Sequence, residues 1–134
     1  MSLFVDTTAI YAGIAENDEF HEAAVRDWTR LFEQRETLLT HSLVEVEAVT
    51  LLQTRIGIGA VEAMSDALLP QIQVVEVDRI ARRAALAGLT ADRRRAVSLV
   101  DRVSFNLMKV LGIKAAFTFD RRFADAGFEL VGPG

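Results

Sequence analysis

The sequence predicts a single α/β domain built on a mostly parallel sheet of about five strands. Segments with helical periodicity alternate with short apolar runs along the whole chain. Those runs are continuously apolar, which is typical of parallel strands that helices cover on both faces. The chain has 134 residues, of which 51% are hydrophobic, so it is long enough for one ordinary core. We therefore expect one domain over residues 1–134.

The expected strands are short runs of β-forming residues. The first, 3–5, ends at Asp6, and the fourth, 113–119, ends at Asp120. The others are expected at 37–40, 72–77 and 128–131, the last being short enough for the edge of the sheet. Right-handed crossovers place the carboxyl ends of all parallel strands on one edge, where ligands of open α/β sheets bind. The sequence therefore predicts a site at that edge.

The expected helices occupy the segments between the strands. Thr7 and Thr8 are expected to start a helix directly after the first strand. Further helices are predicted over 19–35, 42–57, 60–69, 78–87 and 98–111, with an exposed loop or helix end over 88–95. Ser42 to Glu45 and Ser98 to Asp101 each match a capping box, in which a serine and an acid three residues on satisfy each other's backbone donors.

The composition of the chain restricts the kinds of catalytic and metal site that it can form. Without cysteine the chain has no disulfide, thiolate zinc site or cysteine nucleophile, and a cytoplasmic location is favoured. His21 and His41 are the only histidines, so a metal is expected on oxygen ligands, as Mg²⁺ or Mn²⁺ prefer. The start does not resemble a signal peptide, and no apolar run approaches the ~20 residues of a membrane span. The net charge of −4 argues against binding nucleic acid by bulk charge, which leaves local arginine clusters at 93–95 and 121–122.

Four carboxylates are candidates for the site. Asp6 and Asp120 each have a simpler interpretation as a helix cap, but two acids at adjacent strand ends repel each other unless a cation lies between them. Glu47 is preferred to Glu45 because Glu45 already has a place in its capping box, although periodicity alone does not choose between them. Asp101 has the capping box as its alternative role. Two further acids, Asp92 and Asp125, are expected to be exposed.

Several motifs together carry a resemblance to a known family. They are 4-FVDTT-8, Glu47 early in a central helix, 98-SLVD-101, and 118-TFDRRF-123 followed by 126-AGF-128. In this order and spacing, over almost the whole chain, they resemble PIN domains, and they are most similar to the VapC-like toxins of toxin-antitoxin pairs. Aligning the helix by Thr40 and by Thr50-Leu51-Leu52 also favours Glu47 over Glu45.

The resemblance implies a three-layer α/β/α sandwich and a metal-dependent endoribonuclease. Asp6, Glu47, Asp101 and Asp120 then hold Mg²⁺ or Mn²⁺, and RNA is cut to leave a 5′ phosphate and a 3′ hydroxyl. It also implies homodimers and a cognate antitoxin protein.

The residues themselves suggest further roles and two alternatives. Thr118 is a candidate to hydrogen-bond a carboxylate or a water, and Arg121 and Arg122 are candidates for RNA phosphates. One alternative is a non-catalytic PIN-like module that binds RNA or protein. The other is a response-regulator-like phosphoacceptor, which expects paired acids early in the chain and a late lysine, whereas arginines follow Asp120.

Overall fold

A parallel sheet of five strands forms the middle of the molecule. The structure is a computed structural model that describes residues 2–131. The strands are β1 (Ser2–Val5), β2 (Thr37–His41), β3 (Ile72–Val75), β4 (Ala115–Phe117) and β5 (Glu129–Val131). They are ordered β3-β2-β1-β4-β5, and every neighbouring pair is parallel. The predicted parallel sheet with a short edge strand at the end of the chain is confirmed.

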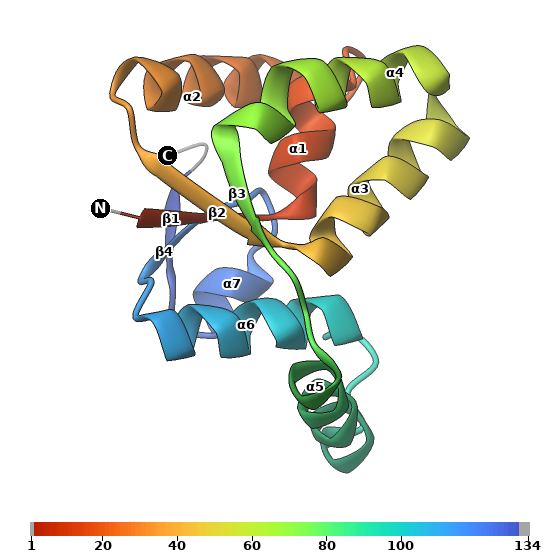
Figure 1. The fold of residues 1–134 in the computed structure, drawn as a ribbon, viewed down its shortest axis with the longest axis vertical. Helices are drawn as coiled ribbons and strands as arrows, with labels where there is room; N and C mark the ends of the chain where they lie inside the picture. Colours follow the sequence, from red (N-terminus) through yellow and green to blue (C-terminus); the bar gives the residue numbers. More distant parts are fainter. Residues whose placement is uncertain (1, 132–134) are drawn as a thin grey trace.

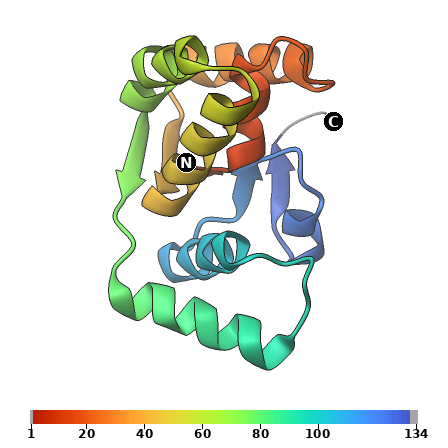
Figure 2. The ribbon, with the colours of Figure 1, turned by 90° about the vertical axis from the view of Figure 1, so that its right-hand side faces the viewer.

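Helices cover both faces of this sheet, which makes the three layers of an α/β/α sandwich (Figures 1 and 2). On one side lie α1 (Thr7–Ile14), α2 (His21–Glu33), α3 (Ser42–Arg55) and α4 (Ile58–Ala63). On the other lie α6 (Leu99–Leu111) and α7 (Arg122–Asp125), with α5 (Arg79–Asp92) packed against the outside of α6. The predicted fold class is therefore confirmed.

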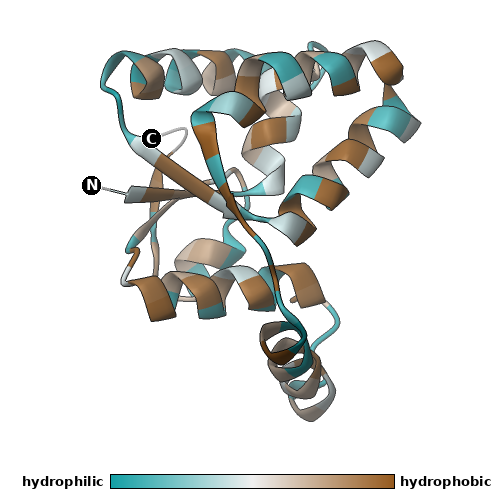
Figure 3. Cartoon of the chain, in the orientation of Figure 1, coloured by the Kyte–Doolittle hydropathy of each residue, from teal (hydrophilic) through white to brown (hydrophobic). Residues whose placement is uncertain are grey.

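The strands bury side chains on both faces, and Figure 3 shows them as largely apolar segments between the helical layers. Phe4 and Phe117 are fully buried. The Phe4 ring stacks on Phe123 of α7 at 6.0 Å, whereas the Phe117 ring meets Trp28 of α2 edge-on at 4.9 Å. The Trp28 ring lies so close to Gly13 of α1 that a Cβ there would be 2.7 Å from the indole nitrogen. Apolar strands thus carry a two-sided core, as their composition predicts.

Some helix boundaries differ from the prediction. The segment expected as one helix over 60–69 consists of α4, a π-helical turn (Met64–Leu68) and a 3₁₀ turn (Leu69–Gln71). The helix expected over 78–87 continues to Asp92, so of the two alternatives predicted for 88–95 the helix end applies as far as Asp92. The alanine- and leucine-rich segment sustains the helix until Arg93, which takes a left-handed conformation with φ 64°.

The capping box predicted at Ser42 to Glu45 is wrong. Strand β2 extends to His41, whose Nδ1 accepts from the backbone N–H groups of Leu43 and Val44 at 3.2 and 3.4 Å, so His41 is the N-cap of α3. Ser42 Oγ instead accepts from Val77 N at 3.0 Å. Since Ser42 is the first residue of the helix and not its N-cap, Glu45 has no capping role.

Within residues 2–131, no helix combines the length and the apolar character that crossing a membrane requires.

Candidate active site

The candidate site lies where the strand order reverses, between β1 and β4. Ligands of open α/β sheets bind outside the carboxyl ends of the strands at such a switch point. Asp6 directly follows β1, and its backbone N–H donates to Phe117 O of β4 at 3.0 Å. Thr118 and Asp120 follow β4. The two strand-end acids predicted from sequence therefore come from neighbouring strands.

Asp6 is a buried carboxylate held by two threonine hydroxyls. Its side chain is 4% exposed, and its Oδ2 accepts from Thr8 Oγ1 and Thr118 Oγ1, both at 2.9 Å. The same oxygen accepts from Thr8 N at 3.4 Å, so Asp6 is also the N-cap of α1. The capping role and the role in a site are thus combined in one side chain.

The threonines are themselves oriented by the backbone that follows β4. Phe119 N donates to Thr8 Oγ1 at 2.9 Å, and Asp120 N donates to Thr118 Oγ1 at 3.0 Å. A hydroxyl has one proton to donate. Because the ionised Asp6 carboxylate can only accept, each hydroxyl directs its proton to Asp6 while its oxygen accepts a backbone N–H. This network fixes the Asp6 carboxylate and the chain leading into Asp120 relative to each other.

Burial also changes the acidity of Asp6. Desolvation raises the pKa of Asp6 from 3.8 to about 6, against the hydrogen bonds of Thr118 and Thr8, which lower it. The charge of Asp101 contributes to the rise. Asp6 thus lies in the electrostatic field of a second candidate acid, and an added positive charge would favour its ionised form.

Asp101 lies in the first turn of α6 and is nearly buried. Its Oδ2 accepts from Ser98 N, and its backbone N–H donates to Ser98 Oγ, both at 3.0 Å, so the capping box predicted here is confirmed. This cap sets the position of the Asp101 side chain at the start of α6.

Asp120 forms a bidentate ion pair with Arg122. Arg122 Nε lies 3.1 and 3.0 Å from the two carboxylate oxygens of Asp120, and Nη2 lies 2.8 Å from Oδ2. Asp120 also accepts from Arg122 N at 2.9 Å, the turn-capping role that its sequence context suggests. Arg122 Nη1 donates to Ala96 O, which ties α7 to the segment before α6.

The same guanidinium reaches the other acids. Arg122 Nε lies 3.9 Å from Asp101 Oδ2. The hydrogen bonds to Asp120 raise the pKa of Arg122, and the charges of Asp120, Asp101 and Asp6 add to this rise. Carboxylates from the end of β4 and the start of α6 therefore contact one cationic group, and the charge of Asp6 from the end of β1 also acts on it. Hard oxygen donors around a positive charge suit Mg²⁺ or Mn²⁺ chemically.

Glu47 is not drawn into this cluster by any direct contact. Within residues 2–131 its side chain takes part in no hydrogen bond or ion pair, and no three acidic or histidine side chains are grouped closely enough to enclose a metal ion. Glu47 does lie one helical turn before Leu51, which lines a cavity together with Thr7 and Thr8. Glu45 lines a different cavity, towards α4. This placement favours Glu47 over Glu45 as a fourth acid, although the capping argument used for that choice is wrong.

The remaining charged candidates are at the periphery. Arg121, Asp125 and Asp92 are exposed, as expected for the two acids. Asp92 lies 2.9 Å from both Arg94 Nε and Arg102 Nη2, and these arginines lower the pKa of Asp92. Asp92 therefore ties the end of α5 to α6.

Sequence reasoning missed Thr8, His41 and Ser104 as supporting residues. Since Nδ1 of His41 accepts backbone N–H groups, its proton is on Nε2, which donates to Ser104 Oγ at 2.8 Å. Ser104 Oγ donates in turn to Val100 O at 3.0 Å. Burial lowers the pKa of His41 to about 4, so the ring is neutral near pH 7. His41 thereby joins α3, which carries Glu47, to α6, which carries Asp101. For Thr8, its position two residues after Asp6 was the available signal.

A parallel sheet in this order, with acids at its switch point, defines the class of protein. Residues 3–129 match the PIN domain family, and the chain belongs to it. The 23S rRNA-specific endonuclease VapC20 of Mycobacterium tuberculosis is 33% identical over 132 residues, which cover 98% of both chains. The crystal structure of VapC20, described as a sarcin-ricin loop cleaving toxin, has a TM-score of 0.82 at 32% identity and covers 98% of this chain and 99% of that one.

More distant structures share the fold alone. VapBC2 from Rickettsia felis, bound to a DNA fragment from its promoter, has a TM-score of 0.70 at 11% identity over 98% of each chain. FitAcB from Neisseria gonorrhoeae has a TM-score of 0.67 at 13% identity and covers 97% of this chain and 96% of that one.

Proposed function

We propose that this chain is a metal-dependent endoribonuclease and the toxin of a toxin-antitoxin pair. One observation carries the proposal: at the switch point of the sheet the Arg122 guanidinium pairs with Asp120 and lies 3.9 Å from Asp101, and the charge of Asp6 from the end of β1 also acts on it. Membership of the PIN domain family and the similarity to VapC20 support the same function.

In this proposal Asp6, Asp101, Asp120 and Glu47 hold Mg²⁺ or Mn²⁺. Hydrolysis of a phosphodiester needs positive charge beside the phosphate and a hydroxide near neutral pH, and a bound divalent cation supplies both. Thr118 and Thr8 keep the Asp6 carboxylate in one orientation through their hydroxyls.

Arginines at the edge of the site complete the proposed machinery. Arg121 and Arg122 are exposed on α7 and its start, beside Asp120. Their guanidinium groups suit RNA phosphates and would offset the repulsion between an acidic site and an anionic substrate.

The test is cleavage of RNA by the purified protein. We expect cleavage with Mg²⁺ or Mn²⁺, none with a chelator, and none with Asp6→Asn, whose circular dichroism spectrum should remain that of a folded protein. Equal cleavage by the wild-type and Asp6→Asn proteins would assign the activity to a contaminant and defeat the proposal.

Ribosomal RNA is the first substrate to try. The printed name of VapC20 assigns that protein to 23S rRNA, and the two sequences align over nearly their full lengths. We expect intact ribosomes or 23S rRNA to be cut at one mapped position, with 5′ phosphate and 3′ hydroxyl ends, whereas bulk transfer RNA is spared. Primer extension locates the position, and preferential cleavage of transfer RNA would replace this substrate with another.

The proposed protein partner is a cognate antitoxin. Structures similar to this chain include VapBC2 and FitAcB, which supports searching for a small reading frame next to the gene. Co-expression of that neighbour should restore growth to cells that express this chain. The protein that it encodes should co-purify with the chain.

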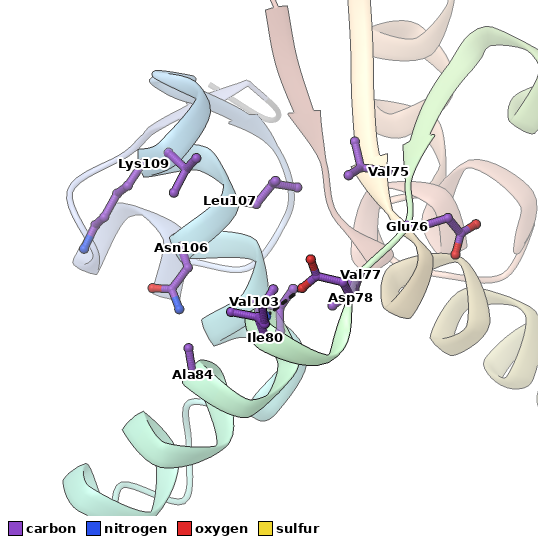
Figure 4. Close-up of a pocket in the computed structure, with 12 residues that line it drawn as sticks. Val75, Glu76, Val77, Asp78, Ile80, Ala84, Val103, Asn106, Leu107 and Lys109 are labelled. Carbon is purple, nitrogen blue, oxygen red and sulfur yellow. Dashed lines mark hydrogen bonds between the residues drawn. The ribbon is translucent and has the colours of Figure 1, made fainter.

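A second copy of the chain is the proposed partner for the groove between α5 and α6. This groove has a volume of about 550 Å³ and is lined mainly by apolar side chains such as Val103 and Leu107 (Figure 4), and Val110 also lines it. Ile80 and Val110 on it are 80% and 82% exposed. Glu76 and Lys109 lie at opposite ends of the groove, so two grooves facing each other across a two-fold axis would pair opposite charges.

Light scattering of the purified protein tests this homodimer. We expect a dimer for the wild type and a monomer for Val110→Asp, because a charge would be buried in the interface. Ile58→Asp is the control, since Ile58 is 61% exposed on α4, away from the groove. A monomeric wild type, or a dimeric Val110→Asp variant, would reject this interface.

A non-catalytic PIN-like binding module is the second candidate function. The observation that favours it is the lack of a ready group of three ligands among residues 2–131. RNA binding without cleavage under all divalent ions would support it. The phosphoacceptor alternative is disfavoured, because that class has the strand order 2-1-3-4-5 and this sheet has β3-β2-β1-β4-β5.

A further inference from the structure

A small cavity adjoins the carboxylate site on the side of α1. It has a volume of about 190 Å³ and is lined by side chains from α1, the α1–α2 loop, α3 and the segment after β4. Pockets for drug-sized ligands begin at about 300 Å³. This cavity therefore suits a single flat ring system better than a whole cofactor.

Aromatic rings and one arginine form much of its wall. Phe20 stacks on Phe119 with the ring centroids 4.9 Å apart and the planes within 11° of parallel. On α1, the Tyr11 ring carries the Arg55 guanidinium 5.4 Å from its centroid. All four side chains line the cavity. Proteins that recognise single-stranded RNA stack bases on such aromatic and guanidinium planes.

The cavity also offers a hydroxyl that has no partner. Thr7 is 3% exposed, and its Oγ1 is buried without a hydrogen-bond partner within the part of the chain that the structure describes. A buried unpaired hydroxyl costs free energy unless a ligand or water satisfies it. Thr7 lines the cavity, and its side chain would have to turn for this buried oxygen to reach a polar edge of a bound ring.

The cavity and the carboxylate site share a wall. Thr8 lines the cavity and donates its hydroxyl proton to Asp6. Phe119 lines it from the position between Thr118 and Asp120 and donates its backbone N–H to Thr8 Oγ1. A ring bound in the cavity would therefore belong to a nucleotide beside the bond that is cut.

We propose that this cavity binds one unstacked base of the RNA, next to the cleaved phosphodiester, between the Tyr11–Arg55 and Phe20–Phe119 pairs. This inference rests on the proposed ribonuclease function and adds a site for substrate recognition to it. Tyr11 and Phe20 supply stacking surface, Arg55 faces the backbone of the same nucleotide, and Thr7 Oγ1 hydrogen-bonds the base edge.

The experiment uses short RNAs that span the mapped cleavage position, each with one base removed to leave an abasic site. For the wild type, one position beside the cleaved bond should lose about tenfold in kcat/KM when its base is absent, the usual size of a stacking contact. Tyr11→Leu should cut the intact RNA about tenfold more slowly and show no further loss at that position. Tyr11→Phe keeps the ring and should keep the wild-type pattern.

The matched control is Phe32→Leu, the same kind of exchange at a half-buried ring of α2 that packs on Trp28 and does not line the cavity. It should keep the wild-type pattern too. The inference is overturned if Tyr11→Leu cleaves like the wild type, or if it retains the full abasic penalty. It is also overturned if Tyr11→Leu changes only inhibition by the co-expressed antitoxin, which would make the cavity a protein-binding site. If the wild type cleaves no RNA, the proposed function itself fails, which is a distinct result.

Discussion

Arg122 engages both carboxylate oxygens of Asp120, with three nitrogen–oxygen distances between 2.8 and 3.1 Å. The guanidinium thus uses the same oxygens that a divalent cation would need. It also lies 3.9 Å from Asp101, so its charge already compensates part of the acidic cluster. A metal ion bound at Asp120 would therefore compete with Arg122 for the same oxygens.

We expect Arg122→Gln to bind Mn²⁺ about tenfold more tightly than the wild type, because a bidentate charge-assisted pair no longer has to be broken. Calorimetric titration of the chelator-treated protein measures this. Arg121→Gln is the control, since Arg121 is exposed and makes no ion pair with Asp120 among the described residues. Equal or weaker binding by Arg122→Gln would contradict the competition.

Asp6→Asn should stabilise the metal-free protein near neutral pH. The pKa of Asp6 is raised from 3.8 to about 6 by burial, so the fold favours the protonated form. The contribution of Asp6 to the free energy of unfolding is complete below pH 3.8 and is lost as the pH rises through about 6. The difference between these two limits is about 3 kcal/mol. The amide keeps an acceptor for Thr8 and Thr118 without the charge. Urea unfolding in the presence of a chelator should show that Asp6→Asn is more stable than the wild type at about pH 7.5 and not at about pH 4. A variant no more stable than the wild type at the higher pH would refute this prediction.

His41 has the opposite effect on stability over a similar range. Burial lowers the pKa of His41 from 6.5 to about 4. The contribution of His41 to the free energy of unfolding is therefore complete above pH 6.5 and is lost as the pH falls through about 4. In the wild type this change opposes that of Asp6. We therefore expect Asp6→Asn to expose a steep loss of stability between about pH 6.5 and 4, of about 3 kcal/mol.

Added to Asp6→Asn, the substitution His41→Asn should remove that acid sensitivity, because asparagine is also a good N-cap for α3 but does not titrate. The single variant His41→Asn should be less stable than the wild type at neutral pH, since the bond from Nε2 to Ser104 is lost. Retained acid sensitivity in the double variant would assign the titration to another group.

The strands and the two strand-end acids were predictable because they depend on local sequence. Continuously apolar runs mark buried parallel strands, and the acid that ends each run must lie at the carboxyl edge of the sheet. Asp6 and Asp120 follow from this rule alone. The capping box of Asp101 is equally local, since all its partners lie within four residues.

The remaining features depend on contacts between distant segments. His41 becomes an N-cap because β2 pairs with β3 through that residue, which overrides the capping pattern at Ser42. The position of Glu47 relative to the other acids depends on how α3 packs on α1, which no periodicity specifies. Arg122 has a local partner in Asp120, but its contacts with Asp101 and Ala96 arise only in the folded chain.

Thr118→Val should make metal binding require a higher pH. The hydrogen bond from Thr118 lowers the pKa of Asp6, so removing it raises that pKa further. Divalent cations bind the ionised carboxylate, and hydrogen bonds to charged groups contribute about 1.5–3 kcal/mol. The midpoint of Mn²⁺ binding against pH should therefore move upward by about one pH unit or more.

Thr40→Val is the matched control for this substitution. Thr40 is a fully buried threonine of the neighbouring strand β2, and its hydroxyl donates to a backbone oxygen, Val5 O at 2.7 Å, and not to a carboxylate. Its loss should lower stability by about 1 kcal/mol and leave the midpoint unchanged. If both variants shift the midpoint equally, the effect comes from general destabilisation. If neither does, Thr118 does not set the acidity of Asp6, and the hydroxyl network serves only to join β1 to β4.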